Sequence, residues 1–332
     1  MSLLRYKRLI LSILILLFVS LTFLFWHFYG LIARPLIARQ NPAVIITLDR
    51  STSAAQFAQI LQDKNLIPYR RPLLIMIRLT GLAHRLKAGV YQIKPGETAL
   101  ELAYRVMAGD VLTQNFTIVA GTTQQKISQD LSKATYLEYH SADWSLIQGN
   151  HPNAEGLVLA DTYQYKGGSS SKILLEHAHR NLISYLNMVW VNRDPNLPYK
   201  NSYELLTAAS IIEKETATSQ ERKLISGVLI NRLNKKMPLQ MDPTVIYGLG
   251  SAYTGKLSHN DMQVDTPYNS YRYYGLPPTP IAMVGKEALD AASHPQLSNY
   301  LYYVSKGDGT HQFSETYQQQ RQAIEQYQHK GF

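Results

Sequence analysis

The 332-residue sequence predicts an α+β protein with a single N-terminal transmembrane helix, a small α+β subdomain and a larger mixed α+β domain. Two observations lead to this prediction. One apolar run near the N-terminus is long enough to cross a bilayer, and the rest of the chain alternates short strand-like and helix-like segments. Its length also suits about two domains of roughly 150 residues once the apolar run is set aside.

The apolar run extends from Leu9 to Ala33, 25 residues without a formal charge. About 20 residues suffice to span a bilayer core. Arg5, Lys7 and Arg8 precede the run. By the positive-inside rule, residues 1–8 form a cytoplasmic tail and residues 9–33 the transmembrane helix. The remainder then lies in the periplasm or outside the cell membrane, so we expect a single-pass protein of the inner (cytoplasmic) membrane.

A cleaved signal peptide is the alternative interpretation of this N-terminus. Its apolar region normally has about 7–15 residues and ends in a small-x-small cleavage site. The run in this sequence is longer, and it ends in Tyr-Gly-Leu-Ile-Ala-Arg. These features favour an uncleaved anchor.

The composition narrows the classes of function. The chain has 33 basic and 24 acidic residues, a net charge of +9, and no cysteine. Without cysteine, a disulfide framework, a thiol nucleophile and a cysteine-ligated zinc site are excluded. The basic excess favours an anionic partner, which could be nucleic acid, anionic lipid or an acidic cell-wall polymer. The predicted topology disfavours nucleic acid.

Short elements are predicted to follow the anchor. In the small subdomain, residues 43–118, they are a strand at 43–48, helices starting near residues 51 and 72, a strand from residue 88 and a helix at 98–108. In the larger domain, residues 119–328, they are a strand beginning at 116, a helix after 123, a loop at 140–155, a strand at 155–166 and a helix at 172–191.

A helix that starts near Tyr203 and carries two glutamates is the most informative segment. Leu206, Ala209 and Glu213 follow one another at i, i+3 and i+7, so Glu213 is predicted to share the apolar side. Glu215 lies about 200° around the helix and is predicted to face water or a cation. Loss of solvation would raise the pKa of Glu213 and favour proton donation near neutrality. The alternative is that Glu213 is a helix-flank carboxylate paired with Lys or Arg.

The segments on either side of residue 217 support a site at this point. Thr218 and Glu221 have the spacing of a capping box, which would begin a second helix and hold Glu213 at a corner. Downstream, residues 239–281 are rich in tyrosine, asparagine and proline. Aromatic faces and amide groups suit carbohydrate, although any single tyrosine could instead be an interior filler.

The candidates for holding sugars are therefore polar and aromatic residues of this downstream region. They are Gln240, Asp242, Tyr247, Asn269 and Tyr271. Asp242 precedes Pro243, so it could alternatively be only a turn or helix-cap residue. No metal and no cofactor is predicted. His177 and His179 lack the His-Glu-x-x-His spacing, and no Gly-x-Ser-x-Gly elbow is present.

Several strings, taken in order, resemble the YceG-like family over residues 40 to 325. They are Glu155-Gly156, Asp161-Thr162-Tyr163, the run ASIIEKET that ends at Thr216, Asn231-Arg232-Leu233, Leu239-Gln240, Asp242 to Gly248, Tyr268-Asn269 with Tyr271, Gly275 to Pro278, Pro280-Ile281, His294-Pro295 and Tyr300-Leu301-Tyr302. One departure is Leu157 to Ala160, where the family often has a Phe-Pro pair.

The resemblance implies a LysM-like subdomain at 43–118 and a YceG-like catalytic domain at 119–328. It implies a lytic transglycosylase that cleaves the bond between N-acetylmuramic acid and N-acetylglucosamine in nascent peptidoglycan strands. A 1,6-anhydro end would form, and the strand would terminate there. In this interpretation Glu213 falls on the family's catalytic glutamate. Glycan strands would be the substrate, and peptidoglycan synthases are an expected partner.

Only one acid is well placed by the sequence, whereas glycoside hydrolysis uses two carboxylates. A transglycosylase needs one, because a hydroxyl of the substrate replaces water. The competing interpretation is a non-catalytic, membrane-anchored glycan-binding or scaffold protein of the cell wall, in which Glu213 is structural.

Overall fold

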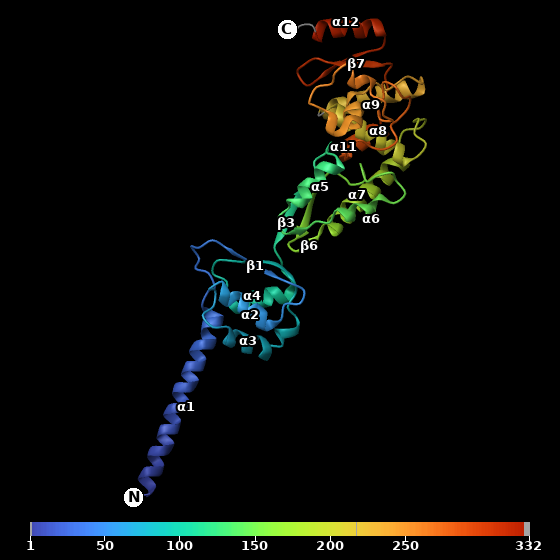
Figure 1. Cartoon of the computed structure of the whole chain (residues 1–332). Coiled ribbons are helices and arrows are strands. Elements are labelled where there is room, and N and C mark those ends of the chain that lie inside the picture. Colours follow the sequence, from blue (N-terminus) through green and yellow to red (C-terminus); the bar gives the residue numbers. More distant parts are fainter. Residues whose placement is uncertain (1, 217, 329–332) are drawn as a thin grey trace. The chain divides into compact units, whose positions relative to one another are not determined.

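The computed structural model describes residues 2–216 and 218–328 and divides into two compact units (Figure 1). The first unit comprises Met1–Gln114, Thr135–Leu137 and Tyr165–Ser169, and the second comprises Asn115–Ala134, Glu138–Gln164 and Ser170–Phe332. The α+β class is as predicted. The predicted boundary after residue 118 lies near Gln114, but the two short later segments of the first unit were not predicted. Met1, the first residue of the predicted tail, lies outside the described residues.

The N-terminal helix α1 (Ser2–Ala33) is continuous. Its segment Leu9–Ala33 is long and apolar enough to cross a membrane, with 25 residues and a mean hydropathy of 2.8. The side chains from Leu9 to Trp26 are exposed, as suits a helix surrounded by lipid. The last turn differs, because Leu31 is buried and Phe28 packs against the core of the first unit. The end of α1 is thus part of that core.

The first unit has the predicted order of strand, two helices, strand and helix. β1 (Val44–Leu48) pairs antiparallel with β2 (Gly89–Ile93). Between them lie α2 (Ala54–Asp63), α3 (Arg70–Leu79) and the short 3-10 helix η1 (Leu82–His84), and α4 (Ala99–Ala108) follows β2. Ser53 and Thr98 each form a complete capping box, which explains where α2 and α4 begin.

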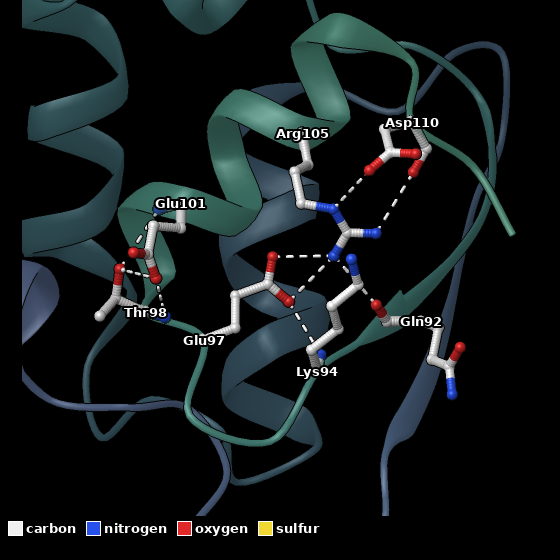
Figure 2. Close-up of polar contacts among 7 residues, drawn as sticks. All are labelled: Gln92, Lys94, Glu97, Thr98, Glu101, Arg105 and Asp110. Atoms are coloured by element: carbon white, nitrogen blue, oxygen red, sulfur yellow. Dashed lines mark hydrogen bonds and ion pairs between the residues drawn. The ribbon is translucent and has the colours of Figure 1, made fainter.

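A charged network fastens α4 to the segment that precedes it (Figure 2). Arg105 Nη1 donates to both carboxylate oxygens of Glu97, at 2.8 and 3.0 Å, and to the Gln92 carbonyl at 3.1 Å. Arg105 Nε donates to Asp110 at 2.8 Å. Because Glu97 is only 8% exposed, loss of the guanidinium would leave a buried carboxylate without its partner. Arg105 therefore holds α4 to β2 and to the turn between them in the first unit.

The second unit is mainly helical. Its helices are α5 (Gln124–Ser132), η2 (Ser141–Trp144), α6 (Ser145–Gln148), α7 (Ser171–Asn192), α8 (Ser202–Glu215), α9 (Ser219–Asn234), α10 (Asp242–Leu249), η3 (Gly250–Ala252), η4 (Asp261–Gln263), α11 (Lys286–Ser293) and α12 (Tyr317–Gln328). The remaining strands form two-stranded sheets: β3 (Thr113–Thr117) with β5 (Thr162–Lys166), β4 (Leu137–Glu138) with β6 (Ser169–Ser170), and β7 (Tyr302–Ser305) with β8 (His311–Ser314).

Helix α8 lies at the centre of this unit. It contacts α7, α9, α10 and α11, and every residue from Leu205 to Ile212 is buried. Asn201 caps its N-terminus by accepting from Glu204 N–H at 2.9 Å. A helix that is buried on all sides has no single apolar face. The periodicity of the sequence therefore could not decide which of its two terminal glutamates points inward.

Three predicted local features are wrong in detail. The strand predicted at 155–166 is continuous only from Thr162, with an isolated bridge before it between Leu159 and Val284. The predicted loop at 140–155 contains the short helices η2 and α6. The predicted capping box is not formed, because Thr218 Oγ1 donates to the Gly309 carbonyl at 3.2 Å and the Glu221 carboxylate contacts His311 Nδ1 at 2.7 Å. Helix α9 itself begins as predicted. Both side chains therefore contact the β7–β8 segment instead of capping the N-terminus of α9.

Candidate active site

Glu213 is not surrounded by apolar side chains. Its Oε1 accepts from Arg222 Nη2 at 3.0 Å, and its Oε2 accepts from Gly285 N–H at 2.9 Å. Its side chain is only 5% exposed, and it lines a pocket of about 450 Å³ together with Arg222, Asp161 and Lys286. The alternative interpretation, a carboxylate paired with arginine, is therefore the one that the structure supports. Each of the two Glu213 oxygens accepts one hydrogen bond from the protein.

Glu215 shows the raised pKa that the sequence predicted for Glu213. Burial raises the pKa of the Glu215 carboxyl to about 7, and the nearby charge of Asp242 adds to this effect. A hydrogen bond with Tyr303 and the charge of Arg232 oppose part of the shift. Its Oε1 is buried and has no hydrogen-bond partner among the described residues. Water is thus kept from one carboxylate oxygen, while the cation Arg232 lies near enough to act on the group.

Three of the predicted sugar-binding residues belong to the surroundings of Glu215. Tyr271 donates to Asp242 Oδ1 at 2.6 Å, and burial followed by the charges of Asp242 and Glu215 raises the pKa of Tyr271. Gln240 Oε1 accepts from Arg232 Nη1 at 3.1 Å. Gln240 and Asp242 are exposed, so both offer polar atoms to a ligand.

Arg232 holds this group of residues in position. Its Nε donates to the Leu301 carbonyl at 2.6 Å, and its Nη1 donates to the carbonyls of Pro238 and Leu239 at 3.1 and 2.8 Å. The residue is 6% exposed, and its guanidinium lies 5.1 Å from the ring centroid of Tyr302. It joins α9 to the β7 strand and to the segment before α10. One buried cation thus fixes three chain segments near Glu215.

Tyr247 lies in a different pocket. Its hydroxyl donates to Glu155 Oε2 at 3.3 Å, and its ring contacts the Tyr268 ring edge-on at 4.8 Å. Burial raises the pKa of Glu155 to about 7, against the hydrogen bonds from Gln124 N–H and Tyr247. These residues line a cavity of about 600 Å³, together with Gln125, Ser128 and Lys214. Uncharged polar groups and aromatic rings in one cavity suit a sugar ring.

Asn269 is a structural residue in the fold. It is fully buried, and its Nδ2 donates to the carbonyls of Met262 and Val264 at 3.0 and 2.8 Å. Its Oδ1 accepts from Tyr271 N–H at 3.0 Å. The amide is therefore occupied by backbone partners, and the structure contradicts its prediction as a sugar contact. Its effect on the site is to hold the loop that presents Tyr271.

The sequence interpretation missed Glu155, Arg232 and Tyr303. Glu155 and Arg232 appear in strings that carry the family resemblance, but the spacing of residues assigns neither of them a task. Tyr303 lies 88 positions after Glu215, and only the fold brings the two together. No cluster of three metal-ligating side chains occurs among the described residues.

Comparison with known proteins decides the family. A family model described as the YceG-like family matches residues 46–326 of this chain. The chain belongs to the YceG-like family. The match spans most of both compact units, so the resemblance predicted from the separate strings is confirmed.

Relatives and solved structures agree with this assignment. An endolytic murein transglycosylase of Bacillus subtilis is 29% identical over 320 residues, which cover 88% of this chain and 87% of that protein. One from Streptococcus pneumoniae is 34% identical over 164 residues, which cover 46% of this chain and 28% of that protein. The crystal structure of a YceG-like protein from Listeria monocytogenes is similar with a TM-score of 0.53 and 26% identity, covering 84% of this chain and 98% of that chain.

Proposed function

We propose that this protein is an endolytic murein transglycosylase that cleaves the bond between N-acetylmuramic acid and N-acetylglucosamine within peptidoglycan strands. The observation that carries the proposal is the Glu215 carboxyl, whose pKa is raised to about 7 and whose buried Oε1 has no hydrogen-bond partner among the described residues. The activity of the Bacillus relative, similar over nearly the full length of both chains, supports the same reaction. We therefore assign the acid to Glu215 rather than to Glu213.

The reaction requires one carboxyl group that acts twice. The protonated Glu215 carboxyl gives its proton to the glycosidic oxygen, and the bond from this oxygen to C1 of the muramoyl residue breaks. The carboxylate then takes the proton of the muramoyl 6-hydroxyl, whose oxygen bonds to C1 and closes the 1,6-anhydro ring. The carboxyl is regenerated and no water is consumed. A second carboxylate is not needed as a nucleophile, in contrast to retaining glycosidases.

A pKa near neutrality suits both steps. With a pKa of about 7, the Glu215 carboxyl is protonated in a large fraction of molecules at neutral pH, and its conjugate base still accepts a proton. Tyr303 and Arg232 favour the carboxylate that forms after the first transfer. Asp242 acts in the opposite direction and favours reprotonation.

The sugar contacts divide between two places. We assign Asp242 and Tyr271 to the sugar next to the cleaved bond, because both lie near Glu215. We assign Gln240 to the same sugar through its contact with Arg232, whose charge also acts on Glu215. We assign Tyr247 to a further sugar unit held in the cavity beside Glu155. Asp242 opens α10 at its first residue, but its carboxylate accepts from Tyr271 and makes no cap bond, which favours a role at the site.

The location follows from the N-terminal helix. We propose that α1 anchors the chain in the cytoplasmic membrane, with both units on the outer side, where new glycan strands emerge. The β-α-α-β order of the first unit supports a LysM-like, glycan-associated module. Termination of nascent strands and contact with peptidoglycan synthases are further parts of the proposal.

Product analysis distinguishes the proposal from a non-catalytic scaffold. Purified glycan strands are incubated with the full chain, and the fragments are measured by mass spectrometry. We expect 1,6-anhydro ends and internal cleavage. Reducing ends one water heavier would identify a hydrolase, and strands of unchanged length would support the scaffold and reject the enzyme.

A further inference from the structure

The net charge of the chain is concentrated next to the membrane anchor. Between residues 34 and 114 the sequence has 11 basic and 5 acidic residues, whereas residues 115–332 have 19 of each. Apart from the basic tail before the apolar run, the positive charge therefore lies in the first unit. The second unit, which contains the proposed active site, is balanced.

The acidic residues of the first unit are outnumbered by its basic residues, and their ion pairs within the described residues all involve Arg105. Glu97 and Asp110 are engaged by Arg105, and Glu101 accepts the hydrogen bonds of its own helix cap (Figure 2). Asp63 accepts from Gln59 at 2.5 Å. Four of the five acidic residues between positions 34 and 114 are exposed, and so are ten of the eleven arginines and lysines. The surface of this region therefore keeps an excess of positive charge.

Helix α3 presents part of this charge beside apolar side chains. Arg71, Ile75, Arg78 and Leu79 follow at i, i+4, i+7 and i+8, which places them on one face, called here the α3 outer face. Ile75 is 47% exposed and Leu79 is 81% exposed. Neither arginine has an ion-pair partner within the described residues. The opposite face carries Leu73, Met76 and Ile77, which are buried in the core.

The module is attached directly to the end of the apolar helix. Leu31 of α1 belongs to its core, and α1 contacts α3, which lies on the side of the unit from which α1 extends (Figure 1). The chain that leaves α1 is bound at once, because Leu36 N–H donates to the Glu97 carbonyl at 2.7 Å and Gly96 N–H to the Ile37 carbonyl at 2.9 Å. No free linker separates the module from the bilayer surface.

We propose that the α3 outer face docks on the anionic phospholipid headgroups around the anchor. Exposed arginines next to exposed apolar side chains are the chemistry that interfacial helices use, with the apolar groups entering the acyl boundary and the cations meeting lipid phosphates. A face for neutral sugars would instead offer aromatic rings and uncharged polar groups. Docking fixes the orientation of the first unit on the membrane and is independent of the proposed enzymatic activity.

The test uses the full chain, which has no cysteine of its own, reconstituted in lipid nanodiscs. A fluorophore is attached through Leu79→Cys, and quenching by lipids with brominated acyl chains is measured. The comparison site is Leu297→Cys in the second unit, where the side chain is 92% exposed. Nanodiscs contain phosphatidylcholine alone or a mixture with phosphatidylglycerol.

We expect strong quenching at position 79 in anionic nanodiscs, weaker quenching in neutral ones and little at position 297. Arg71→Glu with Arg78→Glu should weaken the membrane contact at least about tenfold, since each basic residue near an anionic surface adds to binding. Lys235→Glu with Lys236→Glu, at exposed positions of the second unit, is the matched control and should change nothing. Circular dichroism checks that the reversed variants are folded.

Two results would overturn the proposal. One is quenching at position 79 that equals the quenching at position 297. Quenching at position 79 that changes neither with phosphatidylglycerol nor with charge reversal would count equally against it. The other is a response of the label at position 79 to soluble glycan strands in detergent without any lipid dependence, which would assign the face to polysaccharide.

Discussion

Two glutamates at the end of one helix differ in chemistry because their neighbours differ. Glu213 is held by Arg222 and by the Gly285 N–H, while one buried oxygen of Glu215 has no partner in the part of the chain that the structure describes. One helical step of two residues separates an ion-paired carboxylate from one whose pKa is raised to about 7. The difference gives the site assignment a direct test.

Glu215→Gln should reduce strand cleavage by about 10²–10⁴-fold, because the amide can neither donate nor accept the transferred proton. Glu213→Gln is the matched control on the same helix. Its folded fraction should cleave strands at the rate of the wild type. Release of anhydro-ended fragments from purified strands measures both. Loss of activity in Glu213→Gln with normal activity in Glu215→Gln would restore the assignment made from the sequence.

The activity should also depend on pH in a defined direction. Above pH 7, Glu215 loses the proton that the first step requires, so kcat/KM should fall by about tenfold per pH unit. An ordinary glutamate would start this fall near pH 4.5. A pH–rate profile of the full chain measures the pH at which this fall, the alkaline limb of the profile, begins.

Glu155 is the control for this profile, because burial raises its pKa to about 7 as well. Glu155→Gln should leave the alkaline limb where it is, since we place Glu155 beside a neighbouring sugar. If the alkaline limb of the pH–rate profile disappears in Glu155→Gln, then Glu155 and not Glu215 is the acid.

At the scale of elements, α9 shows packing overriding helix propensity. An alanine Cβ at Gly227 would meet the backbone carbonyl oxygen of Gln296, whose segment is tied to α9 by the Gln296 N–H to Lys223 carbonyl bond at 2.9 Å. A flexible side chain could move aside, but this backbone segment is held. Glycine is therefore required in the interior of α9 at this position.

Gly227→Ala should destabilise the protein by about 1–3 kcal/mol, because overpacking outweighs the gain of about 1 kcal/mol from better helix propensity. Lys223→Ala, exposed on the same helix, should stay within about 0.5 kcal/mol of the wild type. Denaturant unfolding of the full chain in detergent compares the two. A stabilised Gly227→Ala protein would show that the Gln296 segment moves freely.

The elements of the first unit were the easiest to predict. Ser53 and Thr98 are caps whose partners lie three residues further along, so the sequence alone contains the whole interaction. The capping box predicted at Thr218 failed because its two side chains found partners at Gly309 and His311, about 90 positions away. Local signals hold where tertiary contacts do not compete for the same side chains.

For the whole molecule, the end of the long apolar helix α1 also belongs to the core of the first unit. Leu31 is 6% exposed and Phe28 packs against the same core. Removal of the complete apolar run, a usual step in preparing a soluble form, would therefore open the core of the first unit. The boundary between anchor and module lies inside the helix.

A fragment of residues 34–332 should accordingly be less stable than one of residues 28–332. The expected difference is about 2–5 kcal/mol, the usual cost of deleting a large buried side chain. Thermal unfolding of the first unit in both fragments measures it, and Leu31→Ala in the longer fragment should reproduce much of the loss. Equal melting temperatures would show that Leu31 adds little to this core.

The sequence by itself determined the long apolar helix, the order of strands and helices in the first unit, and the family. These depend on local composition, on caps and on strings of adjacent residues, all of which are linear properties of the chain. Only the tertiary structure showed that Glu213 is paired with Arg222 and that the pKa of Glu215 is raised, which is why we propose Glu215 as the acid. A carboxylate's pKa depends on burial and on charges brought from distant segments, here Arg232, Asp242 and Tyr303, and a helix buried on all sides carries no periodic signal of where they lie.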